Sequence, residues 1–214
     1  MNRTKIEWAD YTWNPIKGLC PEACWYCYAR RMYQRFGWDT GISLDTKSIE
    51  YYGRVPDGSK IFVCSTIEIF NPEIPESFRK YVFKEIEKHR NLTFIILTKR
   101  PERIDCPMPD NVWLGVSVTG ADDMGRIFKL AEVKAKVRFI SLEPFFGPTP
   151  RFMFPADIDW LIIGRLTGHG RKNDPELAAL QFMVMQARAF RVPIFLKNNL
   201  KDIWPVPLIQ EYPE

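Results

Sequence analysis

The chain has 214 residues, of which 46% are apolar and 26% are charged, and its formal net charge is +4. That length suits one compact domain, and the balance of apolar and charged residues excludes a disordered chain. No stretch approaches the roughly 18 uncharged apolar residues that cross a bilayer, so we expect no membrane partner.

The charge distribution and the first residues bear on partners and location. Residues 1–100 carry 16 basic and 12 acidic side chains, so the basic excess lies in this half of the chain. Such a mild excess permits a polyanionic substrate without demanding one. Residues 1–7 are polar and lack the apolar core of a signal peptide, so we expect a cytoplasmic protein.

Short apolar runs recur along the chain. Runs of about five residues that are rich in branched and aromatic side chains are typical of strands buried on both faces. An extended segment at residues 13–18 precedes them and is the first expected strand. The runs cover residues 61–64, 93–97, 112–117, 137–141, 160–163 and 192–196.

Helical patterns lie between these runs. One of them places Phe78, Val82 and Ile86 at spacings of four, the period of one buried helix face. The alternation of strand and helix predicts parallel strands joined by right-handed crossovers. The expected helices cover residues 24–36, 75–89, 122–131 and 174–189.

About seven strands are expected, and this number limits the architecture. A complete barrel of eight strand–helix units typically needs about 250 residues, more than this chain has. We therefore favour an α/β fold that is a partial or reduced (β/α) barrel of the TIM type, with parallel strands, over a doubly wound open sheet. Residues 1–214 are expected to form this single domain, with an irregular, glycine-rich insertion at residues 37–60.

Three of the five cysteines, Cys20, Cys24 and Cys27, lie within eight residues. Such clustering in a reducing compartment indicates metal binding rather than a disulfide framework. The C-x3-C-x2-C spacing can present three thiolates on one tight loop to three irons of a [4Fe–4S] cube. The fourth iron is then left without a protein ligand and is open to a bound molecule.

This spacing, with the aromatic Tyr26 before the last cysteine, resembles the motif of the radical S-adenosylmethionine superfamily. The resemblance implies that Cys20, Cys24 and Cys27 are ligands of a [4Fe–4S] cluster and that Tyr26 lies beside the adenine of S-adenosylmethionine. In that superfamily the reduced cluster cleaves the cofactor, and a 5′-deoxyadenosyl radical abstracts hydrogen from the substrate. An electron donor such as ferredoxin or flavodoxin is an implied partner.

The resemblance also implies where the cofactor is held. After the run 61–64, the superfamily binds the methionine ammonium with small residues and an acid, so Ser65, Thr66 and Glu68 are the candidates here. A carboxylate suits an ammonium group, and hydroxyls can accept its remaining hydrogen bonds. Ser117 and Thr119 follow a later run, where related enzymes hydrogen-bond the ribose.

Three further charged residues, Glu143, Arg165 and Lys197, each follow a predicted strand. The ligand-binding groups of a (β/α) barrel lie at the carboxyl ends of its strands. We therefore predict that these three side chains converge there as catalytic residues facing the substrate.

A narrower resemblance covers about residues 5 to 200. Phrases at residues 13–15, 97–103, 111–118 and 159–164 resemble an uncharacterised phage-associated family that shares the cysteine motif. This chain departs from that family in a shorter spacing before the second cysteine. It also has Gly-Arg-Leu-Thr-Gly at residues 164–168, where the family has a Gly-Glu-Ser-Gly-like segment. This narrower resemblance does not indicate a substrate.

Two classes of function remain open. The first is a radical enzyme of unknown substrate, with a nucleic acid or nucleotide slightly favoured over a peptide or metabolite. The phage association and the arginines that follow the cysteines favour the nucleic acid or nucleotide as substrate. The second is a non-catalytic nucleic-acid-binding module stabilised by zinc or by a cluster. Structural zinc needs four ligands, and His89, His169, Cys64 and Cys106 all lack ligand-spaced neighbours.

Overall fold

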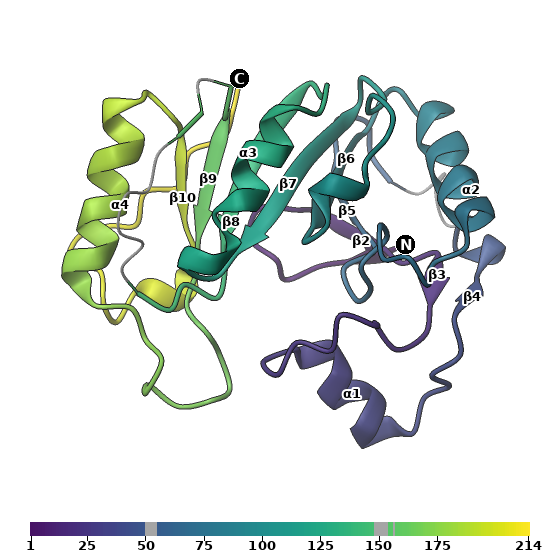
Figure 1. The fold of residues 1–214 in the computed structure, drawn as a ribbon, viewed down its shortest axis with the longest axis horizontal. Helices are drawn as coiled ribbons and strands as arrows, with labels where there is room; N and C mark the ends of the chain where they lie inside the picture. Colours follow the sequence, from purple (N-terminus) through teal and green to yellow (C-terminus); the bar gives the residue numbers. More distant parts are fainter. Residues whose placement is uncertain (50–54, 148–153, 156) are drawn as a thin grey trace.

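The computed structural model describes residues 1–49, 55–147, 154–155 and 157–214. In these residues one mixed α/β domain is built around an eight-stranded sheet with the order β1-β2-β5-β6-β7-β8-β9-β10 (Figure 1). β1 pairs with β2 in antiparallel fashion, and every other neighbouring pair in this sheet is parallel. The strands are β1 (Asn2–Arg3), β2 (Tyr11–Trp13), β5 (Lys60–Val63), β6 (Thr93–Thr98), β7 (Val112–Val118), β8 (Val137–Leu142), β9 (Trp160–Ile163) and β10 (Ile194–Leu196).

The six apolar runs are confirmed as parallel strands, whereas the first strand lies earlier than predicted. β2 ends at Trp13, where its pairing with Val63 of β5 also ends. Pro15 follows, and since proline has no N–H, a ladder cannot continue through it. Downstream, β3 (Ile16–Lys17) pairs instead with β4 (Ser43–Leu44) in a separate two-stranded sheet.

Four α-helices occupy the regions predicted to be helical, and each begins later than predicted, by one residue for the helix expected at 75–89 and by three or four residues for the others. α1 begins after Cys27 rather than at Cys24, because Cys27 is extended, with φ −65° and ψ 117°, and forms the N-cap. α4 begins after Glu176, because the Asp174 carboxylate binds Arg165 and does not cap the helix. The helices are α1 (Tyr28–Phe36), α2 (Glu76–Glu87), α3 (Gly125–Ala131) and α4 (Leu177–Ala189). Short 3-10 helices cover η1 (Thr46–Ile49), η3 (Pro101–Arg103), η4 (Ala121–Asp123) and η5 (Asn198–Leu200).

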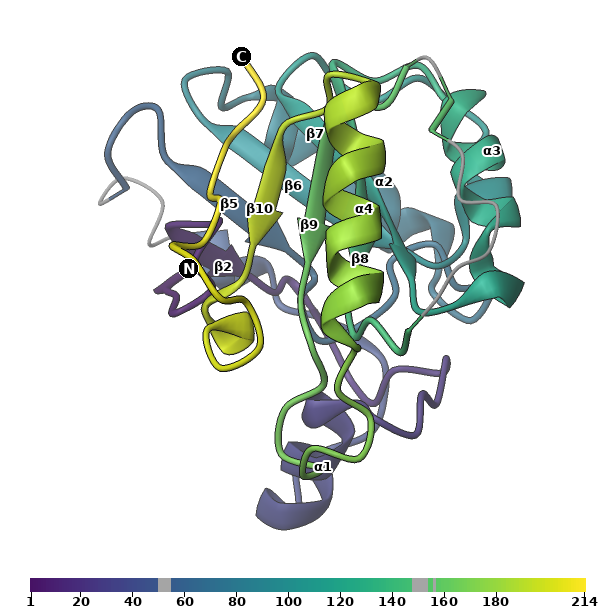
Figure 2. The ribbon, with the colours of Figure 1, turned by 90° about the vertical axis from the view of Figure 1, so that its left-hand side faces the viewer.

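The two faces of the sheet are covered by different parts of the chain. Helices α2, α3 and α4 pack on one face and form the larger core with alternate strand residues such as Val116 and Ile163. Figure 2 shows the chain termini on the other side of the sheet from α4. There a second core joins Trp8 to the strand residues Phe139 and Trp160. We call this second face the inner face.

The inner core is aromatic and closely packed. A Cβ atom at Gly115 would lie 2.3 Å from the Phe139 ring, so the ring requires glycine on the neighbouring strand. The Trp160 indole N–H donates to the Glu211 carbonyl at 2.8 Å, and Tyr212 stacks on the same indole at 5.4 Å. Burial of such aromatic side chains is a major source of stability.

The sheet is open in the part of the chain that the structure describes, since no pairing joins β10 to β2. The two chain termini bridge this region instead. The Tyr212 hydroxyl donates to the Glu7 carbonyl at 3.1 Å, and the Asn198 amide donates to the Glu7 carboxylate at 2.9 Å.

The predicted insertion and the expected lack of membrane spans can also be compared with the structure. The predicted insertion at residues 37–60 contains β4 and η1, and its residues 50–54 lie outside the described part. None of the described helices has the length and apolar character that a membrane span requires.

Candidate functional site

The carboxyl ends of the parallel strands meet at one edge of the sheet, and the cysteine loop and α1 lie against that edge. The Tyr28 hydroxyl, at the start of α1, donates to the carbonyl of Ser65 after β5 at 3.2 Å. The Ser65 amide donates in turn to the Asn14 side chain after β2 at 2.7 Å. Figure 1 shows α1 below the sheet, apart from the other helices. The predicted site residues are therefore gathered at this end of the fold.

The cysteine loop makes two tight turns before α1 begins. Gly18 precedes the loop with a φ of 115°, and a Cβ atom there would lie 2.7 Å from the Gly41 carbonyl oxygen. Within the loop, the Cys27 amide donates to the Cys24 carbonyl at 3.1 Å. All three thiols are free and partly buried, so they stay available as ligands.

The described residues contain no group of three or more His, Cys, Asp or Glu side chains that could hold a metal ion. A structural zinc site needs four ligands around one ion, with Zn–S distances of about 2.3 Å, and no such set is formed here. A [4Fe–4S] cube does not need its ligands around one ion, because each thiolate binds a separate iron. Three free thiols on one loop have the donor chemistry for a [4Fe–4S] cluster, and Cys20, Cys24 and Cys27 are the residues that would hold it.

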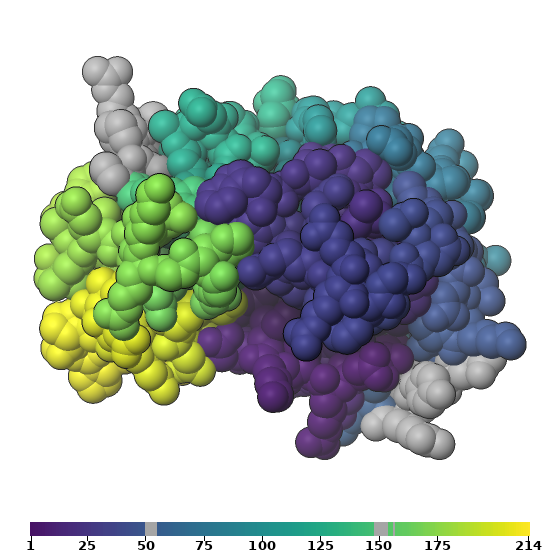
Figure 3. All heavy atoms as spheres, turned by 90° about the horizontal axis from the view of Figure 1, so that it is seen from below, coloured from purple at the N-terminus to yellow at the C-terminus, as the bar shows by residue number. Residues whose placement is uncertain are grey.

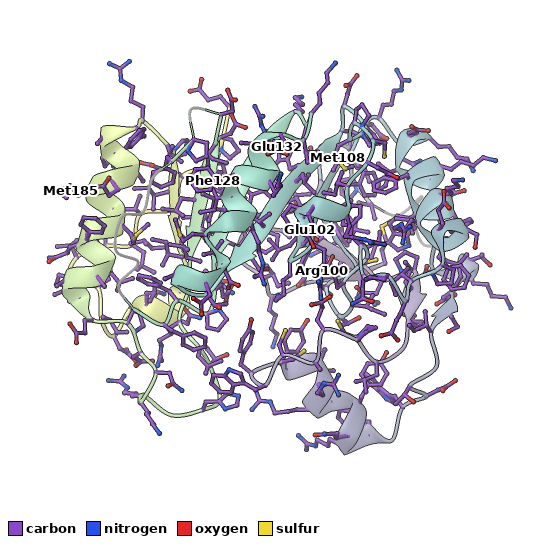
Figure 4. All side chains as sticks on the ribbon, in the orientation of Figure 1. Arg100, Glu102, Met108, Phe128, Glu132 and Met185 are labelled. Atoms are coloured by element: carbon purple, nitrogen blue, oxygen red, sulfur yellow. The ribbon has the colours of Figure 1, made fainter. Side chains whose placement is uncertain are left out.

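Glu22, inside the cysteine motif, fastens the loop to the end of β6. Its carboxylate accepts hydrogen bonds from Arg100 at 2.8 and 3.2 Å and from the Asn71 amide at 2.6 Å. Burial opposes ionisation of Glu22, but the bonds from Arg100 and Asn71 outweigh it and lower the pKa of this carboxyl. Arg100 lies at the lower end of the sheet in Figure 4, on the side of α1. The sequence held no spacing signal for this pair, which are 78 residues apart.

Glu68 organises the loop after β5. Its carboxylate accepts from the Thr98 hydroxyl and the Lys99 amide, both at 2.7 Å, and from the Phe70 amide at 3.1 Å. Its own amide donates to the sulfur of Cys20 at 3.4 Å. Burial raises the pKa of Glu68, and the three hydrogen bonds oppose that rise. The predicted cofactor-binding acid is thus buried among protein donors and contacts the first cysteine through its backbone.

The other predicted cofactor contacts also lie at strand ends. The Ser65 hydroxyl lies 3.1 Å from the Asn14 side-chain oxygen, and Thr66 follows in the same half-buried turn. Ser117 is buried at the end of β7. The hydroxyl and amide of Thr119 both donate to Asp123, at 2.8 and 2.9 Å. Asp123, which the sequence analysis missed, therefore orients Thr119.

Tyr26 lies among groups from several elements. Its ring is 5.8 Å from the Phe146 ring, and Phe146 stacks on Trp25 at 5.7 Å. Burial raises the pKa of the Tyr26 hydroxyl, and the neighbouring Cys24 thiol adds to this rise. Tyr26 thus joins the cysteine loop, of which it is a part, to the segment after β8.

Glu143 and Lys197 meet on the inner face, as predicted. The Lys197 ammonium lies 2.5 Å from one Glu143 carboxylate oxygen and 3.9 Å from the carboxylate of Glu7. Gly164 lies between them, directly after the end of β9, and a Cβ atom there would lie 2.9 Å from Lys197 and 3.0 Å from Glu143. Burial raises the pKa of Tyr28, and the charges of Cys27, Lys197 and Glu143 all act on its hydroxyl.

Arg165 does not join this pair. Arg165 lies beyond the end of β9, and the structure gives its side chain other partners. Its guanidinium donates to Asp174 at 3.1 Å and to the backbone carbonyl of Asn199, and it lies 3.8 Å from Asp202. These bonds tie the segment after β9 to the segment after β10.

Ser141 is a further polar group on the inner face that the sequence analysis did not select. It precedes Glu143 by two residues and is 1% exposed. Its hydroxyl has no hydrogen-bond partner among the described residues.

Comparison with known proteins identifies a family but no activity. A family model described as "Protein of unknown function (DUF5131)" matches residues 3–201. No curated protein matches the chain significantly, and neither does any solved structure.

Proposed function

We propose that this chain, which belongs to the DUF5131 family of proteins of unknown function, is a radical S-adenosylmethionine enzyme. The observation that carries the proposal is the C-x3-C-x2-C loop at the carboxyl-end edge of a parallel sheet. This loop offers three free, partly buried thiols. Three thiolates would bind three irons of a [4Fe–4S] cluster, and the fourth iron would be free to bind a cofactor.

The strand order supports a partial (β/α) barrel of the TIM type. From β2 to β10 the parallel strands follow one another in chain order. A doubly wound sheet reverses its strand order at a switch point, whereas a (β/α) barrel does not. In such folds the ligand site lies at the carboxyl ends, where the cysteine loop is found here.

In this proposal the protein's own residues position the cofactor. Cys20, Cys24 and Cys27 hold the [4Fe–4S] cluster. Bound together, the cluster and S-adenosylmethionine supply one-electron chemistry that releases methionine and 5′-deoxyadenosine and removes a hydrogen atom from the substrate. The remaining contacts are assigned to Tyr26 for the adenine, Ser117 and Thr119 for the ribose, and Ser65, Thr66 and Glu68 for the methionine ammonium.

The Glu143–Lys197 pair faces the substrate. The ammonium and the carboxylate can orient a polar substrate and hold a proton at Lys197 or Glu143 while hydrogen is removed. Arg165 serves this site as a positioning residue, because it fixes the loop that follows Gly164. A cytoplasmic electron donor such as ferredoxin or flavodoxin completes the system.

Anaerobic reconstitution tests the proposal. The loaded protein should be brown and hold about four irons per chain, and S-adenosylmethionine should perturb the electron paramagnetic resonance spectrum of the reduced cluster. Replacing Cys20, Cys24 or Cys27 with alanine should abolish the cluster, whereas Cys106→Ala, at an exposed cysteine outside the loop, should retain it. Stoichiometric zinc without iron would instead favour the non-catalytic nucleic-acid-binding module.

Binding of the cofactor is tested separately. Ser65→Ala and Thr66→Ala should each weaken the binding of S-adenosylmethionine by about 1–3 kcal/mol, the cost of losing a hydrogen bond to a charged group. Glu68→Gln should do the same while it keeps most of the local hydrogen bonds. Unchanged affinity in all three variants would mean that the methionine site lies elsewhere.

A further inference from the structure

The segment from the second cysteine through α1 is basic and contains no acidic residue. Residues 23–38 include three arginines and neither Asp nor Glu. Arg31 and Arg35 lie four residues apart on one side of α1, where like charges destabilise a helix. Neither forms a salt bridge within the part of the chain that the structure describes; Arg31 donates to the Gly168 carbonyl at 3.3 Å. The charge of this helix side is therefore not neutralised by the protein.

Large aromatic side chains are exposed at both ends of this helix. Trp25 is 62% exposed at the amino-terminal end, and Phe36 and Trp38 are 54% and 46% exposed at the other. The rings of Phe36 and Trp38 stack at 5.4 Å, and the Arg35 guanidinium lies over the Phe36 ring at 5.4 Å. The nine residues of α1 span about 13 Å, so two flat aromatic platforms flank a pair of arginines.

The loop after β9 extends this basic surface. Arg171 and Lys172 are exposed in the loop, although Arg171 pairs with Asp202 at 2.7 Å, and the Arg31–Gly168 bond joins the loop to α1. Figure 3 shows the two segments side by side on the face seen from below. We call Trp25, Arg31, Arg35, Phe36 and Trp38 the α1 surface.

We propose that the α1 surface binds single-stranded nucleic acid. Exposed aromatic rings that alternate with unpaired arginines are how proteins bind single strands without sequence preference, by stacking on bases and neutralising phosphates. A duplex hides its base faces and cannot use the platforms. This segment has no acidic residue that could pair with the basic side chains of a peptide, so a basic peptide is a poorer partner.

The inference names a substrate class for the proposed enzyme, and in that respect it rests on the proposed function. Trp25 directly follows the second cysteine of the motif, so a strand on this surface runs past the cysteine loop. Binding itself does not depend on the cluster. The two proposals can therefore fail separately.

The test is fluorescence anisotropy with labelled 12-nucleotide RNA and DNA strands and with a duplex of the same sequence. Both the protein as purified and the reconstituted protein are titrated at several salt concentrations. We expect micromolar binding of the single strands at 50 mM salt and at least tenfold weaker binding of the duplex. A higher affinity for RNA than for DNA would assign the substrate to RNA, because only the 2′-hydroxyl differs along the backbone.

Variants separate stacking from charge. Trp25→Ala and Phe36→Ala should each weaken single-strand binding about tenfold without changing its salt dependence. Arg31→Gln and Arg35→Gln should each reduce the slope of log affinity against log salt by about 0.7. The matched controls are Phe128→Ala, an exposed aromatic on the outer face of α3 (Figure 4), and Arg103→Gln, an exposed arginine in η3. Both controls should bind as the unaltered protein does.

Three outcomes would overturn the inference: no binding at 50 mM salt, equal binding of strand and duplex, or a Trp25→Ala variant that binds normally. Formation of 5′-deoxyadenosine by a protein that fails to bind single strands would overturn this inference and leave the proposed function standing. Single-strand binding by a protein that never loads iron would overturn the proposed function and leave this inference standing.

Discussion

Lys197 and Glu143 form an ion pair across an intervening strand, with their charged atoms 2.5 Å apart although the residues lie 54 positions apart in the chain. The pair is possible because Gly164, between them on the inner face, has no side chain. Both side chains are partly buried, and the pair lies beside Glu7 from the amino-terminal segment. This arrangement brings three distant parts of the chain to one point.

The first prediction concerns Gly164. Gly164→Ala should push Lys197 and Glu143 apart and lower the free energy of unfolding by about 1–3 kcal/mol, the usual cost of overpacking. Urea unfolding measures this change. Gly125→Ala is the matched control, since nothing lies within 4 Å of a Cβ atom there and alanine favours a helix. If the two variants unfold alike, the close contact at Gly164 is not as the structure has it.

The second prediction concerns the pair itself. Lys197→Met should leave the Glu143 carboxylate without its cation and lower the free energy of unfolding by about 1–3 kcal/mol. The Lys197→Met/Glu143→Gln double variant should recover part of that loss, because the uncompensated charge is gone. Iron content should stay at the level of the unaltered protein in both variants, while substrate-dependent formation of 5′-deoxyadenosine is lost. Loss of iron in Lys197→Met would place this lysine at the cluster instead.

The third prediction concerns the fastening of the cysteine loop. Arg100→Gln removes the charged donor from Glu22 and should reduce the iron retained after gel filtration by at least half, because the loop is no longer tied to β6. It should also cost about 1.5–3 kcal/mol of folding stability, the range for a hydrogen bond between charged groups. Glu102→Gln removes only a distant, exposed partner of Arg100 at 3.9 Å and should change neither quantity. Equal iron retention in both variants would contradict the role assigned to Glu22.

The fourth prediction is a pH dependence at the carboxyl-terminal segment. Hydrogen bonds from Arg188 lower the pKa of Glu211, and the Ile194 amide adds to this effect. A carboxyl group whose pKa is lower in the folded protein contributes stability above its unfolded pKa, near 4.5, and loses it as pH falls through the folded value. The difference in Tm between the unaltered protein and Glu211→Gln should therefore be constant from pH 7 to 5 and vanish toward pH 3. The pair is exposed, so the difference should be small. A gap that widens on acidification would contradict this sign.

Much of the fold was predictable, because buried parallel strands leave a direct signal in the sequence. Runs such as residues 93–97 and 160–163 are apolar on both faces and became β6 and β9. The convergence of Glu143 and Lys197 followed from the rule that parallel strands end at one edge. Arg165 was predicted to join them, and its guanidinium instead binds Asp174 and the Asn199 carbonyl, contacts that its position after a strand did not indicate.

Other parts of the site left no local signal. The Glu22–Arg100 pair joins residues from two separate loops, and neither residue type nor spacing marks such a contact in advance. The aromatic inner core depends on Trp8 and Tyr212, which lie outside every predicted strand. The need for glycine at residue 164 became clear only when its neighbours after β8 and β10, Glu143 and Lys197, were known.

The central claim is tested most directly by the formation of 5′-deoxyadenosine. Reconstituted protein is incubated anaerobically with dithionite and S-adenosylmethionine, and the products are separated by liquid chromatography and identified by mass. The proposed function predicts 5′-deoxyadenosine and methionine from the unaltered protein and from Cys106→Ala, and none from Cys20→Ala, Cys24→Ala or Cys27→Ala. A protein that carries a full complement of iron and S-adenosylmethionine yet forms no 5′-deoxyadenosine, or forms it equally in the three loop variants, would contradict the account.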